Sequence, residues 1–457
     1  MSRPSPNLAD PARTAALRLL QAAEDETRPL DPLLAQLDQG TGLGTGLDRR
    51  DVRLARQLTL GCLRWRQRLD WMAGRFSSRP VDELSPWVRQ ALRLGLYQLF
   101  WLDRVPARAA VHTSVELAKR FAHAGAAGLV NAVLRRAQRE YDRLEYPPLE
   151  RDPVAHLACR HSHPEWLIAR WLSRWGLEQT EAILRANNEE APLCVRYNPA
   201  RTVAVEAAVI LAGSTLQAAG PIPGSFIATD AETFLHSEAC TGGLFLVQDL
   251  NAVIPAVLLA PERGEHVLDL CAAPGGKTAQ LAAALGSTGL LVAADLSPSR
   301  LTGLRQNAVR LGLTGLRLVA QDARRPALPA PGHPGFDRVL ADVPCSATGV
   351  LGRHPDARWH RHPEQLPDLV ARQEAILASA FAALRPGGVL VYSTCSLEAE
   401  ENAELVERFL SATPEARLEP ASERFPDRAW AGRFVQTLPG REPGDGCFAA
   451  RLRRETP

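Results

Sequence analysis

Short apolar runs alternate with longer helical segments through the second half of the chain, and this alternation most constrains the fold. From about residue 265 five runs have the length and composition of buried strands: His266–Cys271, Leu290–Asp295, Leu316–Asp322, Arg338–Asp342 and Val389–Cys395. Glycine turns or segments with helical periodicity separate these runs. Because strands that alternate with helices form a mostly parallel sheet with helices on both faces, we expect a doubly wound α/β fold here.

The first 150 residues carry helical signals instead. Ser85 and Pro86 are typical of an N-cap and of the first helical position, and apolar residues then recur at helical spacing from Val88 to Leu99. The same 150 residues hold 23 basic and 17 acidic side chains, a net charge of +6, whereas the remainder has a net charge of −4. A basic helical module beside a slightly acidic one is consistent with a nucleic-acid partner, and equally with a solvated arginine-rich surface.

These patterns divide the chain into three expected parts. Residues 1–148 form an all-helical domain, residues 149–245 a connector, and residues 246–457 the α/β domain. The connector contains a helical stretch from His163 to Trp175, which accounts for the surroundings of the nearby histidines. Since these histidines lack a second ligand pair at the spacing of a zinc site, we expect no metal.

The location of the protein follows from what the sequence lacks. It has no basic start followed by an apolar run, and no stretch of about 18 apolar residues, so we expect neither a signal peptide nor a membrane span. No two of its eight cysteines are separated by only two residues, as a paired metal or redox motif would require. We therefore expect a reduced, cytoplasmic protein, and we expect it to be a monomer.

A glycine turn between the first expected strand and the following helix has the form of a cofactor loop. It is not a phosphate-binding P-loop, because Cys271 stands where that motif needs the first glycine, and the pattern GxGxxG is absent. Asp295 ends the next strand 20 residues after Gly275, the place from which a carboxylate reaches ribose hydroxyls. Asp322 ends the strand after that. A cofactor that has a ribose but needs no phosphate site fits best, and we predict S-adenosylmethionine.

Each part of this cofactor has an expected partner. Its carboxylate would lie at the helix N-terminus, its ribose at Asp295 and its adenine amine near Asp322. The expected binding residues in the loop are Cys271, Ala272, Ala273, Pro274, Gly275, Gly276 and Lys277.

Two cysteines and an aspartate follow the fourth and fifth expected strands. Because ligands bind at the carboxyl ends of strands in such sheets, Asp342, Cys345 and Cys395 are expected to meet beside the cofactor. C5 of a pyrimidine is a poor nucleophile, but a thiolate that adds to C6 makes C5 electron-rich enough to accept a methyl group. A carboxyl group at N3 would stabilise the charge that develops on the ring.

Four segments give the chain a family resemblance. CAAPGGKT, DVPCSATG, GRHPDARW and YSTCSLEAEEN resemble motifs of the RNA cytosine-C5 methyltransferases of the RsmB/NOP2/Sun family, and residues 91–136 resemble the helical RNA-binding domain of the antitermination factor NusB. The resemblance implies a Rossmann-like methyltransferase domain behind a NusB-like domain, acting on small-subunit ribosomal RNA. It also implies that Cys395 is the nucleophile and that Cys345 assists product release. By the same resemblance, Asp342 contacts the target cytosine and the edge of the cofactor.

Two other functions remain open at the level of sequence. A DNA cytosine methyltransferase takes its nucleophile from the proline-cysteine motif, here Pro344-Cys345, and does not require the cysteine after Thr394. A non-catalytic RNA-binding or antitermination factor would need only the helical domain, and the intact cofactor loop argues against it.

The segment between the two cysteine motifs is the expected RNA contact. Arginine forks suit phosphate groups and an indole ring suits base stacking, which points to Arg353, His354, Arg358 and Trp359. The target base must be unstacked to meet a nucleophile. Near the C-terminus the chain departs from the family, because Cys447 stands where an aromatic residue is usual. We expect either altered packing there or a thiol near solvent.

Overall fold

The computed structural model describes residues 10–25, 30–201, 205–213, 215–325 and 334–456. The chain forms two compact units, and each contains two separate stretches of sequence. The first comprises Met1–Asn188 and His354–His360, and the second comprises Glu189–Arg353 and Arg361–Pro457. No helix in the described ranges is long and apolar enough to cross a membrane.

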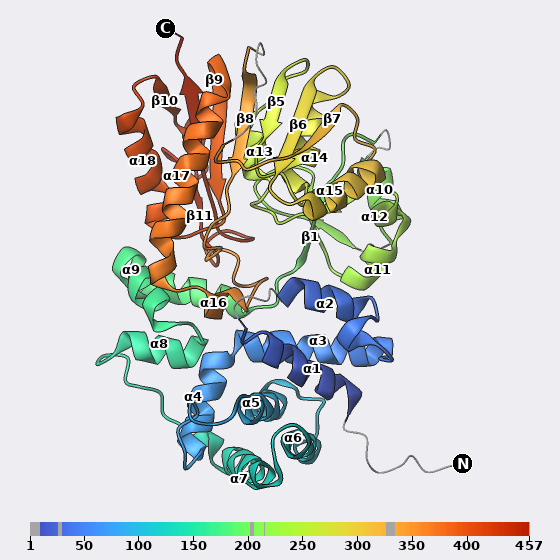
Figure 1. Cartoon of the computed structure of the whole chain (residues 1–457), viewed down its shortest axis with the longest axis vertical. Coiled ribbons are helices and arrows are strands. Elements are labelled where there is room, and N and C mark those ends of the chain that lie inside the picture. Colours follow the sequence, from blue (N-terminus) through green and yellow to red (C-terminus); the bar gives the residue numbers. More distant parts are fainter. Residues whose placement is uncertain (1–9, 26–29, 202–204, 214, 326–333, 457) are drawn as a thin grey trace. The chain divides into compact units, whose positions relative to one another are not determined.

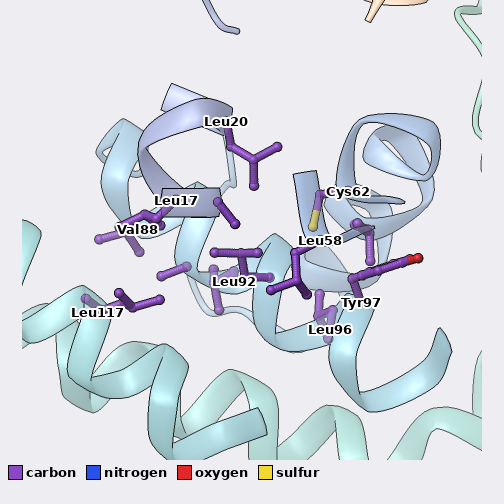
Figure 2. Packing of buried hydrophobic residues seen from close by; sticks show 14 of the residues in the cluster. Leu17, Leu20, Leu58, Cys62, Val88, Leu92, Leu96, Tyr97 and Leu117 are labelled. Carbon is purple, nitrogen blue, oxygen red and sulfur yellow. The ribbon is translucent and has the colours of Figure 1, made fainter. Parts of the chain in front are cut away.

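The first unit is all-helical, as the sequence predicts. Its helices are α1 (Pro11–Ala22), α2 (Leu30–Asp38), α3 (Arg49–Arg64), α4 (Arg66–Phe76), α5 (Pro86–Trp101), α6 (Ala107–Phe121), α7 (Ala124–Glu140), α8 (Pro153–His161), α9 (Glu165–Asn188) and the short α16 (Ala357–His360). Helix α5 begins at Pro86 with Ser85 at the N-cap, although the Ser85 side chain makes no capping hydrogen bond. Figure 2 shows the core of this unit, in which α5 is central: Leu92 and Leu96 pack with Leu17, Leu58 and Leu117.

The second unit contains the predicted doubly wound sheet (Figure 1). Its strands are β5 (His266–Asp269), β6 (Leu290–Asp295), β7 (Leu316–Ala320), β8 (Phe336–Asp342), β9 (Leu384–Thr394), β10 (Ala416–Glu419), β11 (Val435–Thr437) and β12 (Cys447–Arg454). The strand order is β10-β12-β9-β8-β5-β6-β7, and β11 pairs with β12. The pairs β5–β6, β6–β7, β5–β8 and β8–β9 are parallel, whereas β12 runs antiparallel to β9. The expectation of a mostly parallel sheet is confirmed.

Helices cover both faces of this sheet. Successive residues of a strand point to opposite sides, so each strand contributes side chains to both layers. Leu268 packs with α17 (Leu366–Ala382) and α18 (Ala403–Ala412), while its neighbour Val267 packs with α13 (Ile254–Leu259) and α14 (Gly276–Leu285). Helix α15 (Pro298–Leu311) adds Leu301 and Leu304 against Ala293. The two apolar layers hold the strand ends in fixed positions, and the loops at those ends carry the polar site.

The expected connector, residues 149–245, is not a connector and is divided between the two units. Helices α8 and α9 complete the helical unit, because Leu157, Leu167 and Trp171 are buried and the backbone N–H of Gln67 in α4 donates to Ser162. The rest folds into an antiparallel sheet of order β2-β3-β1-β4, with strands β1 (Leu193–Tyr197), β2 (Leu216–Ala218), β3 (Ser225–Ala228) and β4 (Phe245–Val247). Helices α10 (Val205–Leu211), α11 (Ala231–His236) and α12 (Glu238–Thr241) accompany it. The expected boundaries at 148 and 245 are thus replaced by one at Asn188 and by the inserted stretch His354–His360.

Candidate active site

The candidate site lies where the sheet changes winding direction. From β5 the chain proceeds to β6 and β7 on one side, and then returns to place β8 and β9 on the other side. The loops that leave the carboxyl ends of β5, β8 and β9 carry Cys271, Cys345 and Cys395. Ligands of doubly wound sheets bind in the crevice at this switch point.

The two predicted catalytic thiols lie next to each other. The Sγ atoms of Cys345 and Cys395 are 3.4 Å apart, within hydrogen-bond distance, and both cysteines are half-buried and free of disulfides. The hydrogen bond with Cys395 and burial raise the pKa of the Cys345 thiol well above its usual value, and the negative charges of Cys395 and Glu401 add to this. Cys345 is therefore held as a thiol that can donate to the sulfur of Cys395.

Asp342 is fixed beside the thiols by two partners. Its Oδ2 atom lies 2.7 Å from Lys277 Nζ, and its Oδ1 atom accepts a hydrogen bond of 2.7 Å from Ser393 Oγ. Burial alone would lower the pKa of Lys277, but the charge of Asp342 and the hydrogen bond to it outweigh burial and raise this pKa. The site thus contains a fixed ion pair, with the Asp342 carboxylate 31% exposed and the Lys277 side chain 18% exposed.

The glycine turn after β5 has the backbone of an anion-binding loop. Gly275 has a φ of +109°, and a Cβ there would lie 2.9 Å from Leu304 Cγ, so a side chain is excluded twice over. Helix α14 begins at Gly276 without a side-chain cap, which leaves backbone N–H groups at its first turn for a ligand. The loop of Cys271, Ala272, Ala273, Pro274, Gly275, Gly276 and Lys277 therefore fits the carboxylate of S-adenosylmethionine.

The two acids expected to hold the rest of the cofactor differ in their surroundings. Asp295 is buried at the end of β6, where its carboxylate accepts hydrogen bonds from the backbone N–H groups of Ala273 and Ser297. Its Oδ2 atom also forms an ion pair with Arg300 at 3.6 Å, and its Oδ1 atom keeps a second lone pair for a ribose hydroxyl. Asp322 follows β7, and a hydrogen bond with Arg324 lowers its pKa to about 2. Arg324 therefore already contacts this carboxylate, and the adenine contact of Asp322 stays a prediction.

Glycines also bring a third segment close to the Cys395 backbone. The N–H of Gly349 donates to the carbonyl of Cys395, and the N–H of Gly446 donates to the carbonyl of Gly349. A Cβ at Gly349 would lie 2.7 Å from the Cys395 oxygen, so only glycine allows this approach. Cys447 comes next and is buried, so it is not the solvent-near thiol that we considered. Burial raises its pKa, and Lys277, Asp342 and Cys395 are among the charged groups that act on it.

The expected RNA contacts between the cysteine motifs have other roles in the structure. Arg353 forms ion pairs with Asp249 and Asp445, at 2.9 and 2.7 Å, and belongs to the second unit. The next seven residues belong to the helical unit, where Arg358 is fully buried. Its guanidinium donates to the carbonyls of Arg64, Ser162 and Asn187 and to Asn188 Oδ1.

Trp359 is half-buried in the same unit. Its indole Nε1 donates to the carbonyl of Leu63 at 2.7 Å, and the guanidinium of Arg66 lies over its ring. The predicted RNA contacts of Arg353, Arg358 and Trp359 are therefore revised to structural contacts, because their donors and ring face are used within the protein. His354 is 46% exposed and lies 3.7 Å from Asp31, and its RNA contact stays a prediction.

The histidines near the start of α9 are used for packing and hydrogen bonding. His161 Nε2 lies 3.1 Å from Glu181, and His163 Nδ1 lies 2.7 Å from the carbonyl of His161. Among the described residues there is no group of three or more His, Cys, Asp or Glu side chains placed to hold a metal ion.

Sequence reasoning missed Ser393, the partner of Asp342, and Glu401, which contacts both cysteine loops. Both lie within or beside YSTCSLEAEEN, the segment that carries the resemblance. A polar residue two positions before a strand-end cysteine was the available signal for Ser393. Nothing local distinguishes Glu401 from the acids beside it.

Comparison with known families agrees with this geometry. Residues 256–453 match the family model described as 16S rRNA methyltransferase RsmB/F, and residues 10–139 match the NusB family. Residues 163–222 match a ferredoxin-like domain of RsmF/B-like methyltransferases, which accounts for part of the small antiparallel sheet.

Individual relatives extend the similarity over nearly the whole chain. A ribosomal RNA small subunit methyltransferase B of Pseudomonas putida is 40% identical over 96% of this chain and 98% of its own length. A probable ribosomal RNA small subunit methyltransferase B of Synechocystis is 35% identical over 88% of this chain and 91% of its own length.

Solved structures share the fold. The crystal structure of PH0851 covers 98% of this chain and 99% of its own, with a TM-score of 0.79 at 24% identity. A methyltransferase homologue from Pyrococcus horikoshii covers 66% of this chain and 99% of its own, with a TM-score of 0.57 at 27% identity. With the cofactor loop and the paired thiols in place, the chain belongs to the family of ribosomal RNA small subunit methyltransferases B, S-adenosylmethionine-dependent enzymes that methylate ribosomal RNA.

Proposed function

We propose that the protein methylates C5 of an unstacked cytosine in small-subunit ribosomal RNA through a covalent bond between Cys395 and C6. One observation carries the proposal: two thiol sulfurs lie 3.4 Å apart at strand ends that also carry a fixed carboxylate. A single thiol is sufficient for attack, whereas a second thiol at this distance is suited to the later release of the product.

The first step belongs to Cys395 and Asp342. The Cys395 thiolate forms a bond to C6, and the electron pair of the C5–C6 double bond moves through the ring toward N3. An ionised Asp342 accepts a hydrogen bond from the exocyclic amine of cytosine, and the charge of Lys277 offsets the negative charge that develops at N3. Uracil has a carbonyl oxygen in place of this amine, so the carboxylate favours cytosine.

S-adenosylmethionine, when bound, supplies an electrophilic methyl group to C5. The C5 proton must then leave as a base accepts it, and the electrons of the C5–H bond restore the double bond while the C6–S bond breaks and returns Cys395 as a thiolate. Cys345, whose sulfur adjoins that of Cys395, assists this elimination. Both sulfurs therefore act on the same adduct, Cys395 to form it and Cys345 to resolve it.

The product tests this function directly. Protein incubated with methyl-labelled S-adenosylmethionine and small-subunit RNA should yield 5-methylcytidine after digestion of the RNA to nucleosides. RNA that carries 5-fluorocytosine should remain covalently attached, since fluorine at C5 blocks the proton loss. Label in N4-methylcytidine or in another base would overturn the proposal, and label transferred only to DNA would favour the DNA methyltransferase alternative.

The helical unit offers a candidate RNA surface. A groove of about 480 Å³ between α6 and α7 is lined by Pro106, Arg108, Ala109, Val111, His112, Val115, Asn131 and Arg135. Arg108, His112 and Arg135 are exposed, and two of them carry a guanidinium charge. Such a surface suits the phosphates of an RNA backbone. We propose that this groove binds the substrate RNA. We also propose that the protein acts as a monomer in the cytoplasm.

A further inference from the structure

One buried carboxylate joins the loops of both catalytic cysteines. Glu401 ends a short 3-10 helix, Ala399–Glu401, and its side chain is fully buried. Its Oε1 atom accepts hydrogen bonds of 2.8 Å from the backbone N–H of Ser346 and from Gln373 Nε2. Its Oε2 atom accepts from the hydroxyls of Ser346 and Ser396. Four donors thus converge on one carboxylate, which matches the acceptor capacity of its two oxygens.

The two serine donors belong to the loops of the two cysteines. Ser346 directly follows Cys345, and Ser396 directly follows Cys395, so each serine is the chain neighbour of a catalytic thiol. The two loops leave different strands, β8 and β9, and lie 50 residues apart in sequence. The hydroxyls of Ser346 and Ser396 also lie 2.9 Å from each other, so the two loops meet at this carboxylate.

We propose that Glu401 is a positioning residue that holds the two cysteine loops together and thereby sets the distance between the thiols. This inference rests on the function proposed above, because it assigns the spacing a role in that reaction. Glu401 does not touch the reacting atoms, and it acts through Ser346 and Ser396. Its own loop is fixed in turn, since Asn402 Nδ2 donates to the carbonyl of Ser396 and Tyr392 donates its hydroxyl to the carbonyl of Glu401.

A carboxylate does two things here that an amide cannot do. First, it accepts at both oxygens. A glutamine could keep its oxygen on the Ser346 N–H and Gln373, but its NH₂ group would then face the hydroxyls of Ser346 and Ser396, and both would have to change from donors into acceptors. Second, its charge favours the protonated form of Cys345. The titratable groups near Cys345 are Cys395, Glu401 and Tyr392, on the neighbouring strand-end loop and on β9, and the charges of Cys395 and Glu401 raise the pKa of Cys345.

The test separates reach from charge. Glu401→Gln keeps the length of the side chain and removes its charge, and Glu401→Asp keeps the charge and shortens the side chain. Glu404→Gln, at an exposed position three residues later, is the matched control for the loss of one carboxylate. We expect kcat for methyl transfer to fall about tenfold or more in both Glu401 variants, with the KM for RNA and the affinity for S-adenosylmethionine unchanged.

A second measurement does not need the RNA. The pH dependence of alkylation at Cys345, followed by peptide mapping in a Cys395→Ala background, should move to lower pH in Glu401→Gln and stay unchanged in Glu401→Asp. A kcat in either Glu401 variant equal to that of Glu404→Gln, or an unmoved alkylation profile in Glu401→Gln, would overturn the proposal. Ser346→Ala and Ser396→Ala, which each remove one hydroxyl, test the same contacts should the Glu401 variants fail to fold.

The two proposals fail in distinguishable ways. If the unaltered protein makes no 5-methylcytidine, the proposed function is wrong, and the alkylation profile still reports on the influence of Glu401 over Cys345. If 5-methylcytidine forms and the Glu401 variants match the control, only the positioning role is wrong.

Discussion

The ammonium group of Lys277 lies 2.7 Å from the carboxylate of Asp342. Lys277 is one of only two lysines in a chain with 53 basic residues, and its place in the cofactor loop suggested a contact with S-adenosylmethionine. The structure gives its charge a partner at the end of β8, the strand beside β5 in the sheet. The loop proposed to bind the cofactor and the residue proposed to contact the base are therefore joined by one ion pair.

The ion pair between Lys277 and Asp342 predicts that even a conservative substitution of Lys277 lowers kcat. In Lys277→Arg the broad guanidinium cannot occupy the place of a compact ammonium, and in Lys277→Met the charge is absent. A charge-assisted hydrogen bond of about 2 kcal/mol corresponds to a loss of roughly thirtyfold in kcat for methyl transfer. Steady-state kinetics checks this, with Lys119→Arg, on the surface of α6, as the control. Full activity of Lys277→Arg would mean that the choice of lysine is incidental.

The paired cysteines predict opposite outcomes for two substitutions. Cys395→Ala should abolish both methyl transfer and the covalent adduct, because it removes the attacking sulfur. Cys345→Ala should form the adduct and fail to resolve it, so that protein and RNA migrate together on a denaturing gel. Cys240→Ala, a half-buried thiol outside the site, should behave as the unaltered protein. If the trapped species forms with Cys395→Ala instead, the two roles are exchanged.

Asp269 predicts a pH dependence of stability. Burial raises its pKa to about 7, and the hydrogen bond from Thr278 opposes this only in part. A carboxyl whose pKa is higher in the folded protein stabilises it fully below the unfolded value, near 4, and loses this contribution as pH rises through about 7. The loss is at most about 4 kcal/mol. Asp269→Asn should therefore show a smaller fall in melting temperature between pH 5 and pH 8. Parallel curves for the two proteins would refute this.

The groove between α6 and α7 predicts a salt-dependent loss of RNA binding. Reversing two charges, in Arg108→Glu with Arg135→Glu, should weaken RNA binding about tenfold and flatten the dependence of log K on log salt by about one to two units. The affinity for S-adenosylmethionine should not change. Arg49→Glu with Arg50→Glu, exposed on α3, reverses the same charge on the same unit as a control. Equal effects of both pairs would show a diffuse charge effect rather than a bound groove.

Arg358 predicts a large effect on stability from a residue outside the site. Arg358→Ala removes the donor of four oxygen acceptors, in two buried and two part-buried hydrogen bonds, which we expect to cost roughly 3 kcal/mol or more. The melting temperature of Arg358→Lys should lie between those of the unaltered protein and Arg358→Ala, because three donors on a single nitrogen cannot reach the same set of acceptors. Calorimetric melting would measure both, with the exposed Arg372→Ala as control. A melting temperature of Arg358→Ala equal to that of the control would contradict the buried role.

The parts of the site that the sequence predicts are those made by local rules. Strand ends followed by glycine or polar residues placed Asp342, Cys345 and Cys395 correctly, because parallel strands bring their carboxyl ends to one edge of the sheet. The same rule placed the loop from Cys271 to Lys277. The partner of Lys277 could not be predicted in this way, because Asp342 is 65 residues away and no local pattern links the two residues.

The errors share a different cause. Arg358 and Trp359 have the composition of an RNA-binding loop, and a window of sequence cannot reveal that their partners lie at Leu63 and Arg64, almost 300 residues earlier. The division of residues 149–245 was missed because its strands are short and α9 begins within a region of mixed composition. Cys447 was read against a family pattern, whereas its burial is set by β12 and its neighbours.

The stretch His354–His360 has a consequence for how the protein is made. A chain emerges from the ribosome N-terminus first, and its helical unit can begin to fold early. The carbonyls of Arg64, Ser162 and Asn187 lack this donor until Arg358, which follows Cys345 in the sequence, has been synthesised. The helical unit is thus completed by a stretch of sequence that lies between Cys345 and Cys395. A chain that stops before residue 358 lacks the donor for these carbonyls, whereas deleting the first 150 residues would remove only the carbonyl of Arg64 from the acceptors of Arg358.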